Sequence, residues 1–272
     1  MWSRKGVFSF VAFALVSQGA WADITITQLA NEGVVISDGT TRVMIDGLVV
    51  EPYSVYGGLS EEAAAMFKAV SGPYANIDLA LVSHQHHEHN QPAFACDFLK
   101  KSKDTIFVSS AQVLGLMREK CRELVTTSPR IREIDPQYGE PEVFEVKGAK
   151  VTVFPLSHGV FKFAKLQNYG HLIEIGGVTV LHIGDADANP ADFETAGLDQ
   201  VKLDVALIPY GFFRPGPSTA IVQKYLDAPL KIAVHIPPGE MDETRAEIDA
   251  NYPGVTILDA PLKEITVSSA GQ

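Results

Sequence analysis

Positive charge is scarce in this sequence. The 272 residues include 22 lysines and arginines against 33 aspartates and glutamates, which gives a formal net charge of -11 at pH 7. Short basic runs such as Lys100-Lys101 have acids nearby, and no basic cluster stands out. Nucleic acids and anionic membrane surfaces are recognised by clustered lysine and arginine. We therefore expect neither as a partner, and we expect a small-molecule substrate instead.

Cysteine is equally rare, since only Cys96 and Cys121 occur. Neither residue has the spacing of a metal ligand, and nothing around them indicates a cysteine nucleophile. Both fall in segments that we expect to be helical. Two alternatives follow, a disulfide bond between them or two buried thiols.

Long apolar runs are confined to the start of the chain, and no later segment is long enough to cross a membrane, which needs about 20 apolar residues. The start has Arg4 and Lys5, an uncharged apolar stretch over 6–16, and Ala20-Trp21-Ala22. This is the three-part pattern of a secretory signal peptide. We expect residues 1–22 to be removed, leaving 23–272 as a periplasmic or secreted protein without stable membrane association.

No linker, low-complexity tract or short-period repeat divides the rest of the chain. Hydrophobic residues make up 46% and charged residues 20%, so a packed core is readily filled. In each half, β-patterned runs and alternating strand and helix patterns occur in the same order. This order predicts one α/β domain, a four-layer αββα sandwich of two sheets covered by outer helices. The expected strands cover 24–29, 33–37, 42–45, 77–82, 105–109, 130–134, 142–146, 150–155, 170–175, 178–183, 205–209, 231–235, 255–258 and 264–268. The expected helices begin at Ser60 and cover 94–101, 111–124, 190–196, 219–226 and 240–251.

The chemistry is concentrated in the histidines. Four of the eight lie within six residues, in the run Ser83-His84-Gln85-His86-His87-Glu88-His89-Asn90 that follows the expected strand 77–82. Side chains alternate along a strand, so His84 and His86 can grip one ion, while Glu88 and His89 can face a second position. Imidazole and carboxylate are ligands that zinc prefers. The run therefore predicts a metal site.

Three later residues supply further ligands of the same kinds. His158, Asp185 and His235 each follow the end of an apolar strand pattern. Loops at strand ends on a rigid scaffold are where functional side chains are commonly gathered. We therefore expect these residues to join the histidine run.

The order His-x-His-x-acid-His, then His, then Gly-Asp, then His resembles the metallo-β-lactamase superfamily, and the likeness extends over 24–258. The stretch from Tyr169 to Asp185 resembles the ascorbate-phosphate-lactonase-like branch. The resemblance implies two divalent metal ions, with zinc as first choice and manganese or iron as alternatives, and a hydroxide held between them that attacks the substrate. It assigns His84, His86 and His158 to the first ion, Glu88, His89 and His235 to the second, and Asp185 to both.

One ligand departs from the family pattern, because Glu88 stands where aspartate is usual. Its extra methylene moves the carboxylate, which in the family also orients the attacking water. Glu88 and the bridging Asp185 are the candidate catalytic carboxylates. Tyr210, where a strand meets a loop, is a candidate hydrogen-bond donor to a developing oxyanion.

Several other residues have weaker assignments. Asp46 is expected to anchor the loop near the metals. For His171 and His182, a role in orienting ligands competes with plain core packing. The loop aromatics Tyr53, Tyr56 and Phe161 are candidates for the wall of the pocket.

Together these features predict an exported metal-dependent hydrolase of a small-molecule ester, lactone or phosphoester. Two alternatives remain: a periplasmic β-lactamase, or a non-catalytic metal-binding protein that retains the fold. No oligomeric state is predicted.

Overall fold

The computed structural model describes residues 23–159 and 163–268. The expected signal peptide, 1–22, lies outside the described residues. Within them, no helix has both the length and the apolar character needed to cross a membrane.

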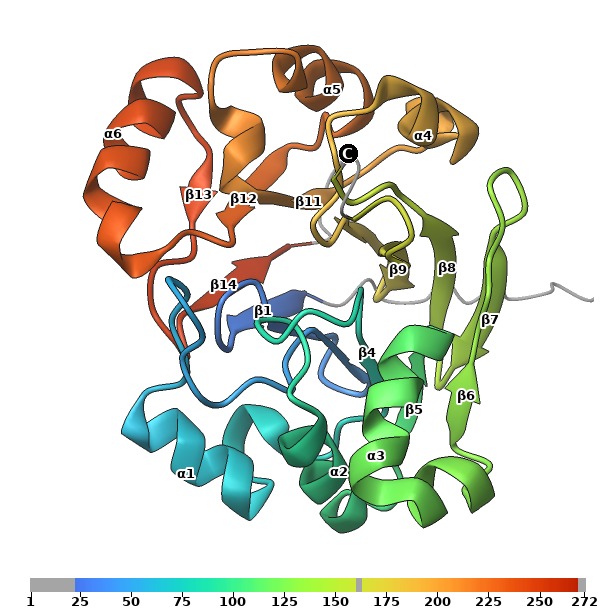
Figure 1. The fold of residues 1–272 in the computed structure, drawn as a ribbon. Helices are drawn as coiled ribbons and strands as arrows, with labels where there is room; N and C mark the ends of the chain where they lie inside the picture. Colours follow the sequence, from blue (N-terminus) through green and yellow to red (C-terminus); the bar gives the residue numbers. More distant parts are fainter. Residues whose placement is uncertain (1–22, 160–162, 269–272) are drawn as a thin grey trace, which may run out of the picture.

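Two seven-stranded sheets face each other at the centre of the molecule (Figure 1). The first has the order β14-β1-β2-β3-β4-β5-β6, and the second has the order β13-β12-β11-β10-β9-β8-β7. The strands of the first sheet are β1 (Ile24–Gln28), β2 (Val34–Ser37), β3 (Arg42–Ile45), β4 (Leu79–Leu81), β5 (Ile106–Ser109), β6 (Ile131–Glu133) and β14 (Glu264–Val267). Those of the second are β7 (Glu142–Val146), β8 (Ala149–Pro155), β9 (Tyr169–Ile175), β10 (Val178–His182), β11 (Val205–Pro209), β12 (Leu230–Val234) and β13 (Thr256–Ile257).

Both sheets combine antiparallel hairpins with parallel strands. Strands β3 to β6 run parallel to one another, as do β10 to β13. The final strand, β14, returns to pair antiparallel with β1, with Thr25 opposite Thr266. Strand β14 therefore forms one edge of the first sheet.

Helices cover the outer face of each sheet. The first sheet is covered by α1 (Glu61–Ala69), α2 (Pro92–Lys101) and α3 (Ala111–Thr127), and the second by α4 (Pro190–Thr195), α5 (Ser218–Tyr225) and α6 (Met241–Asn251). Short 3₁₀ helices are η1 (Gly72–Tyr74), η3 (Leu198–Gln200), η4 (Tyr210–Phe213) and η5 (Pro238–Glu240). The αββα prediction is confirmed, and the expected strands and helices differ from the observed ones mainly by a few residues at their ends.

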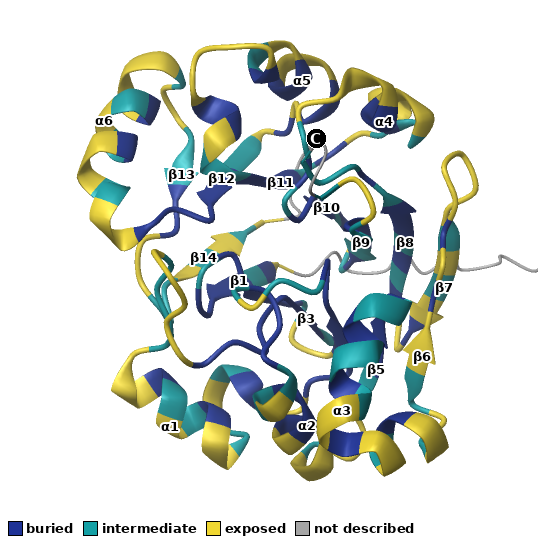
Figure 2. Ribbon diagram, in the orientation of Figure 1, coloured by how far each residue is buried: buried dark blue, intermediate teal, exposed yellow. Residues whose placement is uncertain are grey.

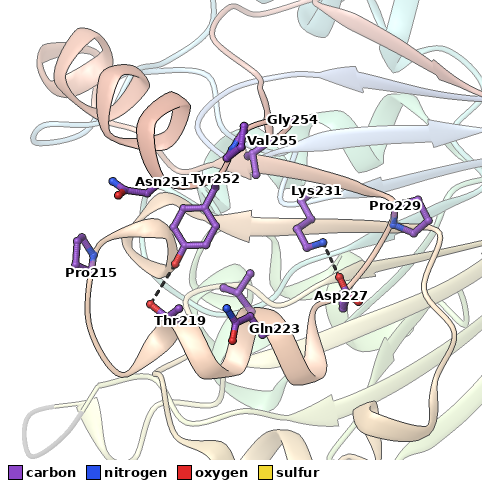
Figure 3. A pocket seen from close by; sticks show the side chains of 12 residues that line it. Pro215, Thr219, Gln223, Asp227, Pro229, Lys231, Asn251, Tyr252, Gly254 and Val255 are labelled. Atoms are coloured by element: carbon purple, nitrogen blue, oxygen red, sulfur yellow. Dashed lines mark hydrogen bonds and ion pairs between the residues drawn. The ribbon is translucent and has the colours of Figure 1, made fainter.

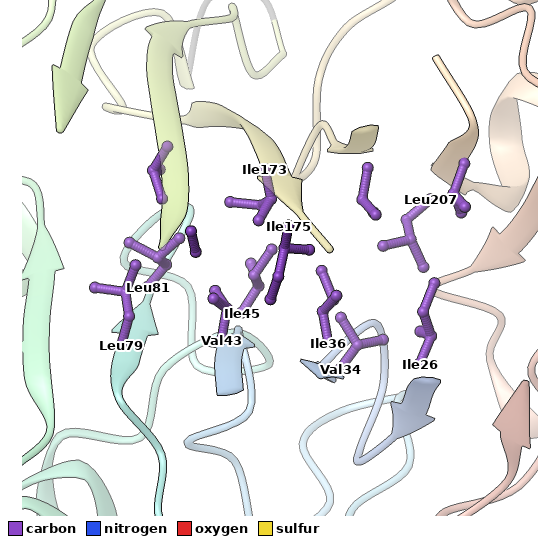
Figure 4. Packing of buried hydrophobic residues seen from close by; sticks show 14 of the residues in the cluster. Ile26, Val34, Ile36, Val43, Ile45, Leu79, Leu81, Ile173, Ile175 and Leu207 are labelled. Atoms are coloured by element: carbon purple, nitrogen blue, oxygen red, sulfur yellow. The ribbon is translucent and has the colours of Figure 1, made fainter. Parts of the chain in front are cut away.

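Alternation along the strands explains the layers. Ile36, Ile45 and Ile173 point between the sheets and pack in one buried cluster (Figure 4). Their strand neighbours Met44 and Leu172 belong to the separate clusters beneath the outer helices. In Figure 2 the strands are largely buried while the outward sides of the helices are exposed. Such two-sided burial holds the strand ends rigidly, which matters because the candidate site is built there.

The two cysteines form a disulfide, so the alternative of two free thiols is excluded. The bond joins Cys96 in α2 to Cys121 in α3. It ties together two helices on the outer face of the first sheet. Ser60 caps α1 as expected, because its side chain accepts a hydrogen bond from the backbone N–H of Ala63 at 3.2 Å.

Candidate metal centre

Four strand ends converge at one edge of the paired sheets. The histidine run follows β4, His158 follows β8, Asp185 follows β10, and His235 follows β12. The structure brings six of the predicted ligands into two groups that could each hold an ion. These groups are His84, His86, His158 and Asp185, and His89, Asp185 and His235.

The first group contains three imidazoles and one carboxylate oxygen. Nε2 of His158 lies 3.2 Å from Nδ1 of His86 and 3.4 Å from Oδ2 of Asp185. Nε2 of His84 lies 3.8 Å from the same oxygen. Atoms that share a tetrahedral ion at about 2.0–2.2 Å are roughly 3.3 Å apart, so these separations suit one ion.

The second group is equally close. Nε2 of His89 lies 3.1 Å from Nε2 of His235 and 3.4 Å from Oδ2 of Asp185. Nε2 of His235 lies 3.1 Å from Oδ1 of Asp185. Asp185 is thus common to both groups, and its Oδ2 contacts histidines of each.

Imidazole nitrogens and a carboxylate oxygen are suitable ligands for divalent ions, and the environment of one His84 nitrogen supports a bound ion. Nε2 of His84 is buried and has no hydrogen-bond partner in the described part of the chain. A buried polar nitrogen without a partner is costly. An ion placed between His84, His86, His158 and Asp185 would satisfy it.

Two histidines of the first group are neutral at ordinary pH. Burial, followed by the neighbouring His89, lowers the pKa of His84 well below its usual value. Burial and His158 likewise lower the pKa of His86. Only neutral imidazole has a lone pair for a metal, so both residues are ready to bind one.

The second group has a different charge state in the metal-free chain. Burial opposes the charged form, yet Asp185 and Glu32 together raise the pKa of His89 well above its usual value. Asp185 also raises the pKa of His235 against the effect of burial. His89 and His235 in turn hold the pKa of the Asp185 carboxyl well below its usual range. Metal binding here must therefore displace protons from the histidines.

Side chains behind the ligands fix the ring orientations. Oγ of Ser83 lies 2.5 Å from Oδ2 of Asp46 and 3.0 Å from Nδ1 of His84. Ser83 can therefore donate to Asp46 and accept from the His84 N–H, which leaves the His84 Nε2 lone pair facing the site. Nδ1 of His89 lies 3.0 Å from Oδ2 of Asp46. Asp46 thus positions ligands of both groups, more than the loop anchor that the sequence suggested.

Backbone geometry fixes Asp185 as well. Gly184 has φ +53°, and a Cβ there would come within 2.4 Å of Oδ1 of Asn168. That same oxygen accepts the backbone N–H of Asp185 at 3.2 Å. Glycine is therefore required for the turn that delivers Asp185. His235 itself has φ +62°, a strained conformation for a non-glycine residue at the position where β12 ends.

Two predicted site residues supply no ligand atom to either group, although the Glu88 charge opposes the lowering of the His86 pKa by burial. Glu88 is half-buried, and its carboxylate belongs to neither group. Within the described residues, the hydrogen bond that Glu88 makes is at its backbone carbonyl, which accepts from Nδ2 of Asn31 at 3.3 Å. Tyr210 donates its hydroxyl hydrogen to Oε2 of Glu240 at 3.1 Å, and the Arg214 guanidinium lies over its ring.

Each of the two groups has an aromatic ring packed against one or more of its histidines. Tyr56 packs edge-on against His235, with ring centroids 4.3 Å apart. Phe163 stacks on His158 at 5.3 Å and contacts His86. Burial, and then Asp185, raises the pKa of Tyr56 to about 12, so its hydroxyl stays protonated. Tyr56 fits the predicted wall of the pocket, whereas Tyr53 is exposed and contacts His87. The third candidate, Phe161, lies outside the described residues.

Sequence reasoning missed two residues of the site. Asn168 holds the Gly184–Asp185 turn, and Glu32 lies 2.9 Å from Nδ1 of His89. Glu32 comes from the turn between β1 and β2, between the expected strands 24–29 and 33–37, where the sequence indicated no chemistry. Nothing in the local pattern of either residue points to a metal centre.

A separate hollow of about 500 Å³ lies between α5 and the segment that follows α6 (Figure 3). Tyr252 donates to Oγ1 of Thr219 at 3.1 Å across it, and Lys231 pairs with Asp227 at 2.8 Å. The hollow shares no residue with either metal group. It is therefore not part of the candidate centre.

Solved structures share this fold at low sequence identity. The chain matches the metallo-β-lactamase fold protein YhfI of Bacillus subtilis with a TM-score of 0.61 and 16% identity, covering 90% of this chain and 100% of that one. It matches Igni18, a metallo hydrolase of the archaeon Ignicoccus hospitalis, with a TM-score of 0.58 and 15% identity, covering 91% of this chain and 99% of Igni18. It matches CmlA, a diiron β-hydroxylase of Streptomyces venezuelae, with 0.56 and 16%, covering 91% of this chain and 54% of CmlA.

Sequence comparison identifies the family directly. No curated protein is significantly similar to the chain. A family model described as "Beta-lactamase superfamily domain" matches residues 54–252, most of the chain, including every predicted ligand. The prediction of a metallo-β-lactamase-fold protein is confirmed at the level of the superfamily, and the lactonase-like branch is not distinguished. With this match, the two sheets and the grouped histidines, the chain belongs to the β-lactamase superfamily of metal-dependent hydrolases.

Proposed function

We propose that this protein is an exported, two-metal hydrolase that cleaves an ester or lactone bond in a small, uncharged molecule. The observation that carries the proposal is the position of Asp185. Its carboxylate lies 3.4 Å from Nε2 of His158 on one side and 3.1 Å from Nε2 of His235 on the other. A carboxylate between two histidine groups is the arrangement expected of a bridge between two ions.

Bound there, two divalent ions, zinc in our proposal, would activate water and polarise the substrate oxygen as Lewis acids. His84, His86 and His158 would hold the first ion, and His89 and His235 the second. The chain's own residues set the geometry. Ser83 and Asp46 fix the ring of His84, and Asp46 fixes that of His89.

The surroundings of the groups favour an uncharged substrate over a phosphoester. Tyr56 and Phe163 place aromatic rings against His235 and His158, one histidine from each group. The ion pairs formed by the grouped residues join histidines to carboxylates, and within 23–159 and 163–268 none involves lysine or arginine. Phosphate sites usually carry such cations. The protonated Tyr56 hydroxyl can instead donate a hydrogen bond to a carbonyl oxygen.

Export is part of the proposal and has separate support. Residues 1–22 carry the signal-peptide pattern, and the disulfide between Cys96 and Cys121 is typical of proteins in oxidising compartments. The net charge of -11 gives no reason to expect an anionic membrane or nucleic acid as partner.

The catalytic proposal is tested with the full chain produced by export. Elemental analysis should give two ions per chain and identify the metal. The substrate panel is an aryl ester, a γ-lactone, an aryl phosphodiester and a chromogenic β-lactam. We expect turnover of the ester or lactone, and its loss by at least a thousandfold in His84→Ala and in Asp185→Asn.

The matched control is His87→Ala. His87 is exposed and lies within the same run, yet it belongs to neither group, so its removal should leave turnover unchanged. Equal turnover in His84→Ala, Asp185→Asn and the wild type would refute the proposed centre. Turnover of the β-lactam alone would favour the β-lactamase alternative, and metal binding without turnover on any substrate would favour the non-catalytic one.

Export is tested by the mass of the recovered protein. Signal cleavage should give a chain that begins at Asp23 in the periplasmic or culture fraction. A full-length chain retained with the cells would contradict this part of the proposal.

A further inference from the structure

A second cluster of charged groups is buried directly beneath the candidate centre, between the two sheets. It contains Glu32, Asp46 and His182, whose potential ligand atoms all lie within 4.8 Å of one another. All three residues are buried. Both carboxylate oxygens of Glu32 lack a hydrogen bond in the described part of the chain.

An ionised carboxylate is costly to bury unless positive charge or donors lie nearby. Asp46 meets this requirement, since it accepts hydrogen bonds from the backbone N–H of Ser83 at 2.7 Å and from Ser83 Oγ. Glu32 has no such hydrogen bond in the described part of the chain. Its Oε1 lies 2.9 Å from Nδ1 of His89 and 3.7 Å from Nε2 of His182, so the charge that compensates its burial must come chiefly from the His89 ring.

Two carboxylates therefore converge on one nitrogen. Oδ2 of Asp46 is 3.0 Å from Nδ1 of His89 and accepts its hydrogen bond, while Oε1 of Glu32 lies 2.9 Å from the same nitrogen outside hydrogen-bond geometry. A third ion bound by both carboxylates would face this N–H group at close range. The cluster is better explained as a partner of His89 than as an ion site of its own.

The opposite nitrogen of the same ring belongs to the second metal group. His89 points Nε2 at His235 and Asp185, and Asp185 is shared with the first group. With a metal bound, the second group would therefore contribute two neutral imidazoles and a single carboxylate that it shares with the first group. Glu88, the acid in the position where the superfamily pattern has aspartate, supplies no atom to it.

Negative charge behind a metal-binding histidine fixes its tautomer and makes the metal-facing nitrogen a stronger donor. We propose that Glu32 is a positioning residue for the second metal, which through Nδ1 of His89 replaces the negative charge that Glu88 does not deliver directly. The inference rests on the proposed two-metal function, and it makes the β1–β2 turn a determinant of second-site affinity.

The test compares Glu32→Gln with Glu88→Gln in the full exported chain, using Zn²⁺ as the probe. Each variant removes one carboxylate charge and keeps the side-chain shape. Stepwise affinities are measured by competition with a chromophoric chelator, and bound zinc is counted by elemental analysis. Glu32→Gln should weaken the second zinc by 10–100-fold and leave the first within about threefold, as is typical when a carboxylate behind a ligand is removed. Glu88→Gln should leave both affinities within about threefold.

A merely structural role for Glu32 would lower the melting temperature of the metal-free protein without separating the two zinc affinities. Glu32→Asp keeps the charge and should lose less second-site affinity than Glu32→Gln. If Glu32→Gln does not fold, Glu88→Gln still decides, because a loss of the second zinc there overturns the inference.

Other outcomes separate this inference from the proposed function. Two zinc ions in the wild type with both affinities unchanged in Glu32→Gln overturn the inference alone. Three ions per wild-type chain, falling to two in Glu32→Gln, also overturn it, in favour of a third ion bound by the cluster. A single ion in the wild type at saturating zinc overturns the two-metal function itself.

Discussion

Replacement of His171 by leucine should make the metal-free protein less sensitive to acid. His171 lies on β9, opposite Val153 of β8 and His182 of β10, and is fully buried. Neither ring nitrogen has a hydrogen-bond partner in the described residues. Burial, with a smaller effect of His182, lowers the pKa of His171 from 6.5 to about 3. The folded chain therefore keeps this ring neutral where the unfolded chain protonates it.

The magnitude follows from proton linkage. A histidine whose pKa is lowered by folding contributes its full stability above the unfolded value of 6.5, and the contribution is lost as the pH falls from 6.5 toward 3. Each pH unit in this window is worth about 1.4 kcal/mol. Between pH 7.5 and pH 5, wild-type unfolding free energy should therefore fall by about 2 kcal/mol more than that of His171→Leu.

The assay is urea unfolding followed by circular dichroism, in chelator so that metal binding does not enter the pH dependence. Comparing the change with pH within each protein removes the packing cost of the substitution. Val153→Ala is the matched control, because it alters packing opposite His171 without removing a titrating group. It should lose stability equally at both pH values. The same pH dependence in His171→Leu and the wild type would refute the reasoning.

Three further outcomes are expected. Replacing both cysteines, Cys96→Ser with Cys121→Ser, should lower the free energy of unfolding by about 3.5 kcal/mol, because the disulfide closes a loop whose ends are 25 residues apart. Added reductant should have the same effect on the wild type, and an unchanged urea midpoint would contradict this expectation. Tyr56→Phe should lower kcat tenfold or more at unchanged zinc content. Tyr210→Phe should leave kcat unchanged, because the Tyr210 hydroxyl already donates to Glu240. A larger effect at Tyr210 would make Tyr210, and not Tyr56, the hydrogen-bond donor to the substrate. Chelation should lower the melting temperature and zinc should restore it, since ligands that bind only the folded chain stabilise it; an unchanged melting temperature would argue against a folded-state metal site.

Much of the fold could be predicted because its signals are local. Alternation of isoleucine and threonine marks β1, short apolar runs mark β2 and β3, and Ser60 followed by Glu61 marks the start of α1. Boundaries were less predictable, as at β12, where the pattern runs to His235 but the strand ends at Val234. His235 has a left-handed backbone conformation, which no local sequence pattern predicts.

The candidate site divides in the same way. His158, Asp185 and His235 could be predicted because each lies within three residues after the end of a strand. Strands β8, β10 and β12 run in the same direction, so their ends lie at one edge of the sheet, where loops commonly carry functional residues. Glu88 shows where that reasoning fails. Its place in the run is correct, but the direction of its side chain depends on the turn that continues from His86, whose backbone carbonyl accepts the N–H groups of His89 and Asn90.

Glu32 shows a deeper limit, because its environment is made entirely by contacts distant in sequence. In the chain it is one acid in a hairpin turn, beside Asn31 and Gly33, and such residues are ordinarily solvated. The fold instead closes the second sheet over that turn and places His89 and His182 against its carboxylate. A charged residue buried in this way is costly, so its presence is best explained by the positive charge it faces. If that charge is the second metal, the two halves of the centre depend on different information. The first metal would be held by two histidines of one run with His158 and the shared Asp185, whereas the second would depend, beyond its own ligands, on an acid from the first hairpin.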